Sequence, residues 1–153
     1  YEDILRSSGL HVNVTIEDVD REPMVAAQGL EGNDRPHPDI WQFQNLPDTI
    51  AQDITAVKNI NAQGLFPEDI KNTALVRVEI ESVNPYREFA IEGETKNVLI
   101  AHSKFGGGQF RGEVVPGERL MLHHVSSGDT PPYLPTGWDA KGVYVYPRPP
   151  LYD

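Results

Sequence analysis

The sequence predicts a mainly β fold, an antiparallel sandwich or small barrel of about six or seven strands with one amphipathic helix and extended arms at both ends. Three observations support this fold class. Short stretches of alternating apolar and polar residues recur along the chain, 13 glycines and 13 prolines interrupt them, and one segment alone has apolar residues at helical spacing. With 153 residues, the chain (1–153) has the length of a single domain.

The first predicted strand covers residues 10–17, where apolar and polar residues alternate without interruption. This period of two predicts a half-buried strand with its four aliphatic side chains on one face. These side chains are Leu10, Val12, Val14 and Ile16.

Residues 18–47 contain acids, prolines and glycines that break any period, and they predict a long irregular excursion. Such an excursion can reach a neighbouring subunit. We expect Ile40, Trp41 and Phe43 to anchor it on a partner protein, because large apolar side chains commonly carry the binding energy of an interface.

The predicted helix covers residues 47–60. Asp48 can cap its first turn, and Ile50, Ile54 and Val57 fall on one helical face. A further helical turn is expected at residues 66–72, where Pro67 suits the first helical position.

The rest of the chain reads as strands separated by turns. In residues 74–83, Val76, Val78 and Ile80 are expected on one face. Pro116 and Gly117 predict a turn, and the glycines at 106–108 predict a hairpin tip or bulge rather than a phosphate loop, because another strand follows them instead of a helix. The other expected strands are residues 87–93, 97–103, 112–115, 119–125 and 142–147.

Charge and composition exclude several functions. The formal net charge is −10, which disfavours nucleic acid and anionic membrane surfaces as partners. The absence of cysteine excludes disulfides, thiolate metal sites and cysteine nucleophiles. No apolar run approaches the roughly 20 residues of a membrane helix, so no membrane insertion is expected.

The five histidines form no recognisable metal or catalytic motif. His123 and His124 are adjacent on a predicted strand, so they should face opposite sides and not share an ion. His102 can pair with His123 across two strands, with Glu113 or Glu118 completing a site, but we expect one histidine to be buried and the other exposed. We therefore expect no metal site, no catalytic residue and no cofactor.

Two segments resemble sequences of hotdog-fold dehydratases and hydratases. Residues 110–122, FRGEVVPGERLML, resemble a strand-turn-strand segment of that family, and residues 32–39, GNDRPHPD, resemble its upstream acid and histidine motif. The resemblance implies an acid/base pair of Asp34 and His37 that acts on a thioester substrate.

The C-terminal tail, residues 126–153, combines prolines with aromatic residues. Prolines stiffen an extended chain and aromatic rings supply contact area, so this tail is suited to bind a neighbouring subunit. Its expected contact residues are Tyr133, Trp138, Tyr144, Tyr146 and Tyr152.

Taken together, these features favour a non-enzymatic structural or assembly protein of a large particle, such as a virion, a phage capsid or a phage tail. Its expected partners are other protein subunits, of the same or a different chain, and its expected location is a virion or an extracellular particle. A carbohydrate-binding module is the first alternative, because exposed Trp and Tyr rings stack on sugars, and a hotdog-type enzyme is the second.

Overall fold

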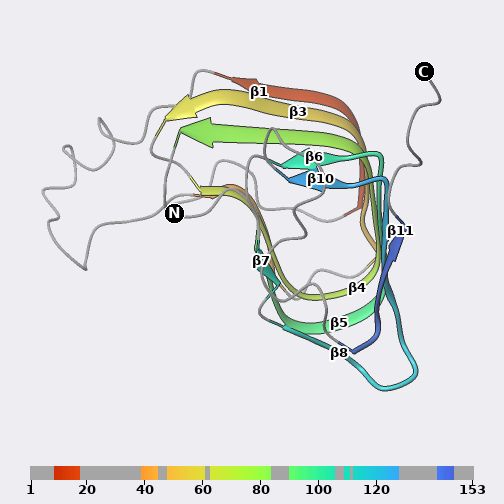
Figure 1. Ribbon diagram of the computed structural model, residues 1–153. Helices are drawn as coiled ribbons and strands as arrows, with labels where there is room; N and C mark the ends of the chain where they lie inside the picture. The colour runs from red at the N-terminus through yellow and green to blue at the C-terminus, as the bar shows by residue number, and fades with distance from the viewer. Residues whose placement is uncertain are drawn as a thin grey trace, which may run out of the picture.

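The computed structural model describes residues 9–17, 39–44, 48–60, 63–83, 90–105, 109–110, 112–127 and 141–146 (Figure 1). These residues form strands and connecting turns, and none of them lies in a helix. The strands are β1 (Leu10–Glu17), β2 (Asp39–Gln44), β3 (Ile50–Ile60), β4 (Gln63–Val83), β5 (Ala90–Ala101), β6 (Lys104–Phe105), β7 (Gln109–Phe110), β8 (Glu113–Val114), β9 (Leu120–His123), β10 (Ser126–Ser127) and β11 (Val143–Tyr146).

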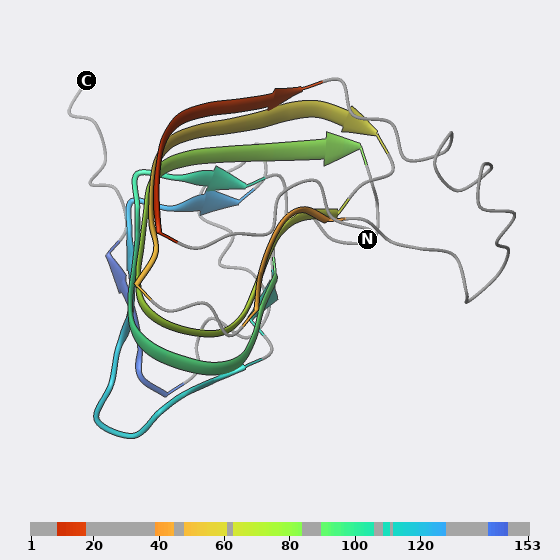
Figure 2. The ribbon, with the colours of Figure 1, turned by 180° about the vertical axis from the view of Figure 1, so that it is seen from behind.

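Every strand pairing among the described residues is parallel, and the main order is β1-β3-β4-β5-β9-β11. From β3 onward, paired residues are separated by a nearly constant length of chain: 24 residues (50 to 74), 25 (74 to 99), 22 (99 to 121) and 23 (121 to 144). The chain therefore coils, and each turn lies on the turn before it, as in a parallel β-helix (Figures 1 and 2).

The predicted antiparallel sandwich is wrong, because no described strand pairs with its neighbour in an antiparallel sense. Consecutive short strands were interpreted as hairpins, in which a turn reverses the chain. Here the corners bend the chain without reversing it, so the next strand with the same direction lies one coil further on. The 21-residue strand β4 illustrates this, since it bends and pairs along its length with both β3 and β5 (Figure 1).

The predicted helix at residues 47–60 is also wrong, because this segment contains β3. Among the side chains of β3 that the structure describes, those of Ala51, Ile54 and Ala56 are buried, a spacing of three and then two. The step of three arises from a bend at Asp53 and imitates the spacing of a helical face. Ile50, expected on that face, is 48% exposed. The expected helical turn at residues 66–72 lies within β4.

One corner of the coil is a column of residues with positive φ. Asn13, Asp53, Arg77, His102 and His124 have φ between 51° and 57°, and the strand registers place them directly above one another. Asn, Asp and His enter this left-handed region more readily than most residues. At each such corner the alternation of inward and outward side chains shifts by one residue.

This shift corrects the expected face of β1. Leu10 and Val12, before the corner, are 72% and 43% exposed, whereas Val14 and Ile16, after it, pack against the core. The same correction applies to β4, where Val78 and Ile80 are buried but Val76 is only partly so. A single left-handed residue therefore divides each expected apolar face into an outward and an inward part.

A second corner carries a ladder of exposed side-chain amides. Asn72 donates from Nδ2 to Oδ1 of Asp48, and Asn97 donates from Nδ2 to Oδ1 of Asn72, both at 2.9 Å. All three residues have positive φ, between 48° and 56°. The ladder joins three successive coils at their outer edge.

The core lies inside the coil and consists of apolar side chains stacked from turn to turn. One stack contains Ala51, Leu75, Ile100 and Leu122, and the next contains Ile54 and Val78, followed by the buried hydroxyl of Ser103. Ser103 Oγ accepts from the amide of Val78 and donates to the carbonyl of Ala101, so its polarity is satisfied.

Both expected arms contain strands of the coil. Residues 39–44 of the predicted excursion form β2, which pairs with β4, and the predicted tail contributes β10 and β11. The turn at Pro116 and Gly117 is present: Gly117 has φ of 89°, and the amide of Glu118 donates to the carbonyl of Val115. The glycines at 106–108 lie outside the described residues.

The hotdog resemblance gains no structural support. The strands on either side of the 116–117 turn, β8 and β9, both pair in parallel with β5, and the described residues contain no helix that corresponds to the long helix of that fold. Asp34 and His37 lie outside the described residues. No described segment forms a helix with the length and apolar character needed to cross a membrane.

Candidate functional site

Two features of the outer surface are candidates for function: a flat apolar face and a histidine cluster at its margin. The apolar face lies between the two corner columns, where two outward side chains from each of six coils stack in register. One column comprises Leu10, Ile50, Ala74, Leu99, Met121 and Tyr144, and the other comprises Val12, Gln52, Val76, Ala101, His123 and Tyr146. Of these, Ala101 is buried by its neighbours.

This apolar face contains no Asp, Glu, Lys or Arg. Among the described residues, the exposed large apolar side chains all lie on it: Leu10, Val12, Ile50, Tyr144 and Tyr146, each between 43% and 72% exposed. They lie at the two ends of the face, on β1 and β3 and on β11, and the coils between them contribute less exposed side chains. Exposed apolar surface of this kind commonly marks an interaction surface.

The expected partner-binding residues have different outcomes. Tyr144 and Tyr146 lie on the apolar face and are 47% and 48% exposed. Trp41 is 1% exposed and contacts the ring of His11, with 4.8 Å between ring centroids, so its indole belongs to the core of this chain. Ile40 and Phe43 lie on β2, paired with β4. Tyr133, Trp138 and Tyr152 lie outside the described residues.

The outward residues of β1 and β3 were not among the candidates predicted from the sequence. Leu10 and Val12 were assigned to a buried strand face, and Ile50 to a buried helix face. A search for repeats about 24 residues apart would have found the signal, because Asp48, Asn72 and Asn97 are each followed five residues later by a polar residue of the other corner.

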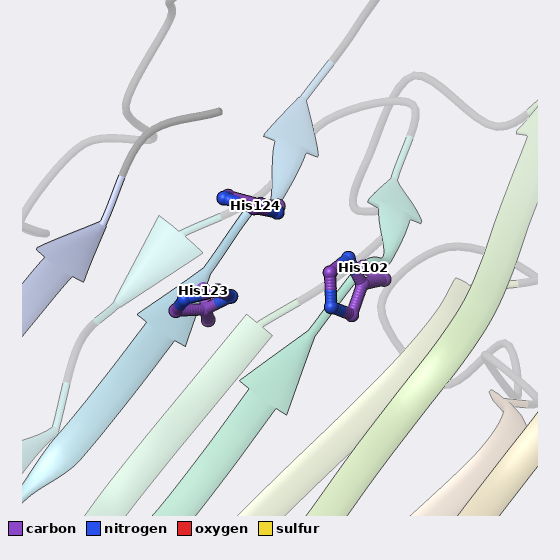
Figure 3. Close-up of side chains that lie close together, drawn as sticks. All are labelled: His102, His123 and His124. Carbon is purple, nitrogen blue, oxygen red and sulfur yellow. The ribbon is translucent and has the colours of Figure 1, made fainter. Parts of the chain in front are cut away.

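The histidine cluster comprises His102, His123 and His124. His123 ends β9, and His124 and His102 occupy the same corner column on neighbouring coils (Figure 3). His102 is exposed, and neither of the other two is buried. One ligand nitrogen from each of the three rings lies within 4.8 Å of the others.

The three imidazole rings lie close together. The centroids of His123 and His124 are 4.2 Å apart, and the ring of His102 lies 5.0 Å from that of His124 and 5.5 Å from that of His123. Tyr146, on the next coil, lies 5.7 Å from His123. The cluster therefore combines two successive residues of one coil with one residue of the coil before it.

The expectation that His123 and His124 face opposite sides is wrong. It assumed an uninterrupted strand, in which neighbouring side chains alternate. His124 has φ of 55°, so the chain bends at this residue and both rings remain on the outside. Neither histidine is buried, which also contradicts the expected division into one buried and one exposed ring.

The expected carboxylate partners do not join the cluster, whose members among the described residues are the three histidines alone. Glu113 lies on β8, where it pairs with Glu94, and Glu118 precedes β9 near Lys96. The strongest charge pair near the cluster is one coil away from His102: Arg77 donates from Nε to Oδ1 and from Nη2 to Oδ2 of Asp53. The hydrogen bonds from Arg77 lower the pKa of Asp53 to about 2.

Comparison with known proteins gives no family or function. The chain matches no protein-family model, and no curated protein and no solved structure is significantly similar to it.

Proposed function

We propose that this chain is a non-enzymatic structural or assembly protein of a large particle of the virion, capsid or phage-tail type, and that copies of it associate through the apolar face. The observation that carries the proposal is the gathering of the exposed large apolar side chains on that face. A second copy is the favoured partner because the face spans all six coils of the main strand order, and an identical face has matching height and character.

The electrostatics of the face are compatible with association between copies. The chain carries a net charge of −10, which would drive copies apart if those charges met. The two columns of the apolar face contain no acidic side chain, and the charged groups at the face are His123 within it and Arg119, whose guanidinium reaches the ring of Tyr144. The acidic residues therefore remain outside the contact.

The apolar face alone is smaller than one side of a standard protein interface. Six strands about 4.8 Å apart and about five residues of width give a patch of roughly 500 Å². One partner in a standard interface buries about 800 Å². The apolar face thus supplies about 60% of that area, and we assign the rest to the arms predicted within residues 18–47 and 126–153.

The test is the native mass in solution by light scattering at moderate salt, with Ile50→Asp as the variant. Ile50 lies on the second of the six coils, between Leu10 and Ala74, and is 48% exposed, so the substitution should leave folding intact. An unpaired carboxylate desolvated in the contact costs about 3 kcal/mol or more, which corresponds to at least a 100-fold weaker association.

The matched control is Thr55→Asp, on the same strand but beyond the corner, where the side chain points away from the apolar face. We expect the wild type and Thr55→Asp to form the same oligomer and Ile50→Asp to dissociate. A wild-type chain that remains a 17.1 kDa monomer at high concentration, or an Ile50→Asp variant that assembles normally, would refute the proposal.

Carbohydrate binding is a second candidate, supported by the neighbouring exposed rings of Tyr144 and Tyr146. Arg119 lies over the ring of Tyr144, with its guanidinium carbon 5.7 Å from the centroid, so this ring face already has a cation partner. Tyr146→Ala would abolish sugar binding if this candidate were correct, and a glycan screen with the wild type and this variant distinguishes it from assembly.

A further inference from the structure

We propose that His102, His123 and His124 form a binding site for one divalent transition-metal ion such as Zn²⁺. The cluster offers three imidazole nitrogens within 4.8 Å of one another, on neighbouring coils of one chain. The site does not depend on the proposed assembly, because all three ligands come from the same molecule.

The spacing of the nitrogens is close to what a metal ion requires. Zn–N bonds of about 2.0–2.1 Å in tetrahedral geometry place neighbouring ligand nitrogens about 3.3 Å apart. Each pair therefore needs to close by at most about 1.5 Å, a movement that ring rotation about the side-chain torsions supplies. None of the three side chains is buried, so this rotation takes place at the surface and requires no repacking of the core (Figure 3).

The ligand type selects the class of ion. Neutral imidazole suits Zn²⁺, Cu²⁺ and Ni²⁺, whereas Ca²⁺ and Mg²⁺ prefer oxygen ligands. Three histidines in a four-coordinate site leave one position for water or another exchangeable donor. The structure therefore assigns selectivity for transition metals over Mg²⁺ and Ca²⁺.

The positive charge of Arg77, which lies near the site, is paired with an acid. Arg77 occupies the same corner column one coil from His102, and a free guanidinium there would repel a cation. Its Nε and Nη2 donate to the two carboxylate oxygens of Asp53, which carries the compensating negative charge. The net charge of −10 further favours a cation on this molecule.

The positive φ of two of the histidines limits which replacements can test the site. His102 and His124 have positive φ, 51° and 55°, so each should be replaced by a residue that tolerates this conformation. Asn does so and lacks the imidazole. The variants are His102→Asn, His124→Asn and His123→Gln. The matched control is His11→Gln, which removes a histidine on β1 that contacts Trp41 at the other end of the strand order.

The measurement is calorimetric titration of the metal-free chain with ZnCl₂, accompanied by the visible absorption spectrum with Co²⁺. We expect one ion per chain and a tetrahedral Co²⁺ spectrum, with MgCl₂ producing no binding. Each cluster variant should bind Zn²⁺ at least about 10- to 100-fold more weakly, because replacing even a residue that only hydrogen-bonds to a metal ligand causes a loss of this size. The control should bind Zn²⁺ normally.

Three results would overturn the proposal: no Zn²⁺ binding by the wild type, unchanged binding by His102→Asn, or equal loss in the His11→Gln control. Circular dichroism of every variant verifies the fold, so a loss of binding is assigned to the ligand and not to unfolding. Repeating the titration with Ile50→Asp separates the two proposals, because a chain that no longer assembles should still bind the ion.

Discussion

Substitution of Asn72 tests the corner geometry, because Ala and Gly should there reverse their usual order of stability. Asn72 has φ of 48° and hydrogen bonds to both Asp48 and Asn97. Asn72→Ala and Asn72→Gly lose the same two side-chain hydrogen bonds, each with a net value of about 0.5–1.5 kcal/mol and near the lower end at this exposed ladder. The two variants differ in the free-energy cost of holding residue 72 at a positive φ.

A non-glycine residue in the left-handed region costs about 1–2 kcal/mol, whereas Gly adopts it freely. Asn72→Ala should therefore lower the free energy of unfolding by about 2–4 kcal/mol. Asn72→Gly should be about 1–2 kcal/mol more stable than Asn72→Ala. In an ordinary strand position the order is the opposite, with Gly about 0.5–1 kcal/mol less stable than Ala.

The assay is urea unfolding followed by circular dichroism. Ala74→Gly is the control, because Ala74 lies two residues further along β4 and has no positive φ. It should be destabilised by about 0.5–1 kcal/mol. An Asn72→Gly variant that is no more stable than Asn72→Ala would refute the left-handed corner and, with it, the coil geometry that stacks these residues.

Two further predictions concern other corners. Gly93→Ala should lower the free energy of unfolding by about 2–3 kcal/mol in the same assay, because φ is 68° and the added Cβ would clash with Oδ1 of Asp69. Gly9 has a φ of 99°, and a Cβ added there would have no atom within 4 Å, so Gly9→Ala should show the backbone cost alone. Equal losses of stability in Gly93→Ala and Gly9→Ala would refute the clash with Asp69. The pKa of Asp53 is lowered from 3.8 to about 2, mainly by hydrogen bonds from Arg77, so its contribution to stability is present above pH 4 and is lost as the pH falls through 2. Asp53→Asn should remove this part of the acid dependence of urea unfolding, and an unchanged pH profile would contradict the ion pair.

The sequence predicted strand positions better than it predicted their arrangement. The expected strands at 10–17, 74–83, 97–103 and 119–125 all overlap strands of the structure, because β-branched and apolar residues favour extended chain in any sheet. Parallel or antiparallel pairing depends instead on whether each connection reverses the chain. That property here rests on left-handed corners such as Asp53 and Arg77, which no alternation pattern reveals.

The same corners explain why the candidate sites were missed. His123 and His124 share one side because the chain bends at His124, and Leu10 and Val14 point to opposite sides because it bends at Asn13. Both conclusions reverse what an uninterrupted strand implies. Among the expected contact residues, Tyr144 and Tyr146 are exposed on β11, whose alternation contains no such bend, and their role in binding stays a prediction.

The most direct test of the account is an NMR measurement of contacts between backbone protons across the strands. Parallel pairing predicts nuclear Overhauser effects that link Ala74 with Leu99 and Ala101 with His123 and continue one residue onward to His102 with His124. Strong contacts between α-protons of residues whose numbers run in opposite directions along two strands would indicate antiparallel pairing. That result would contradict the coil, the apolar face and the histidine cluster together.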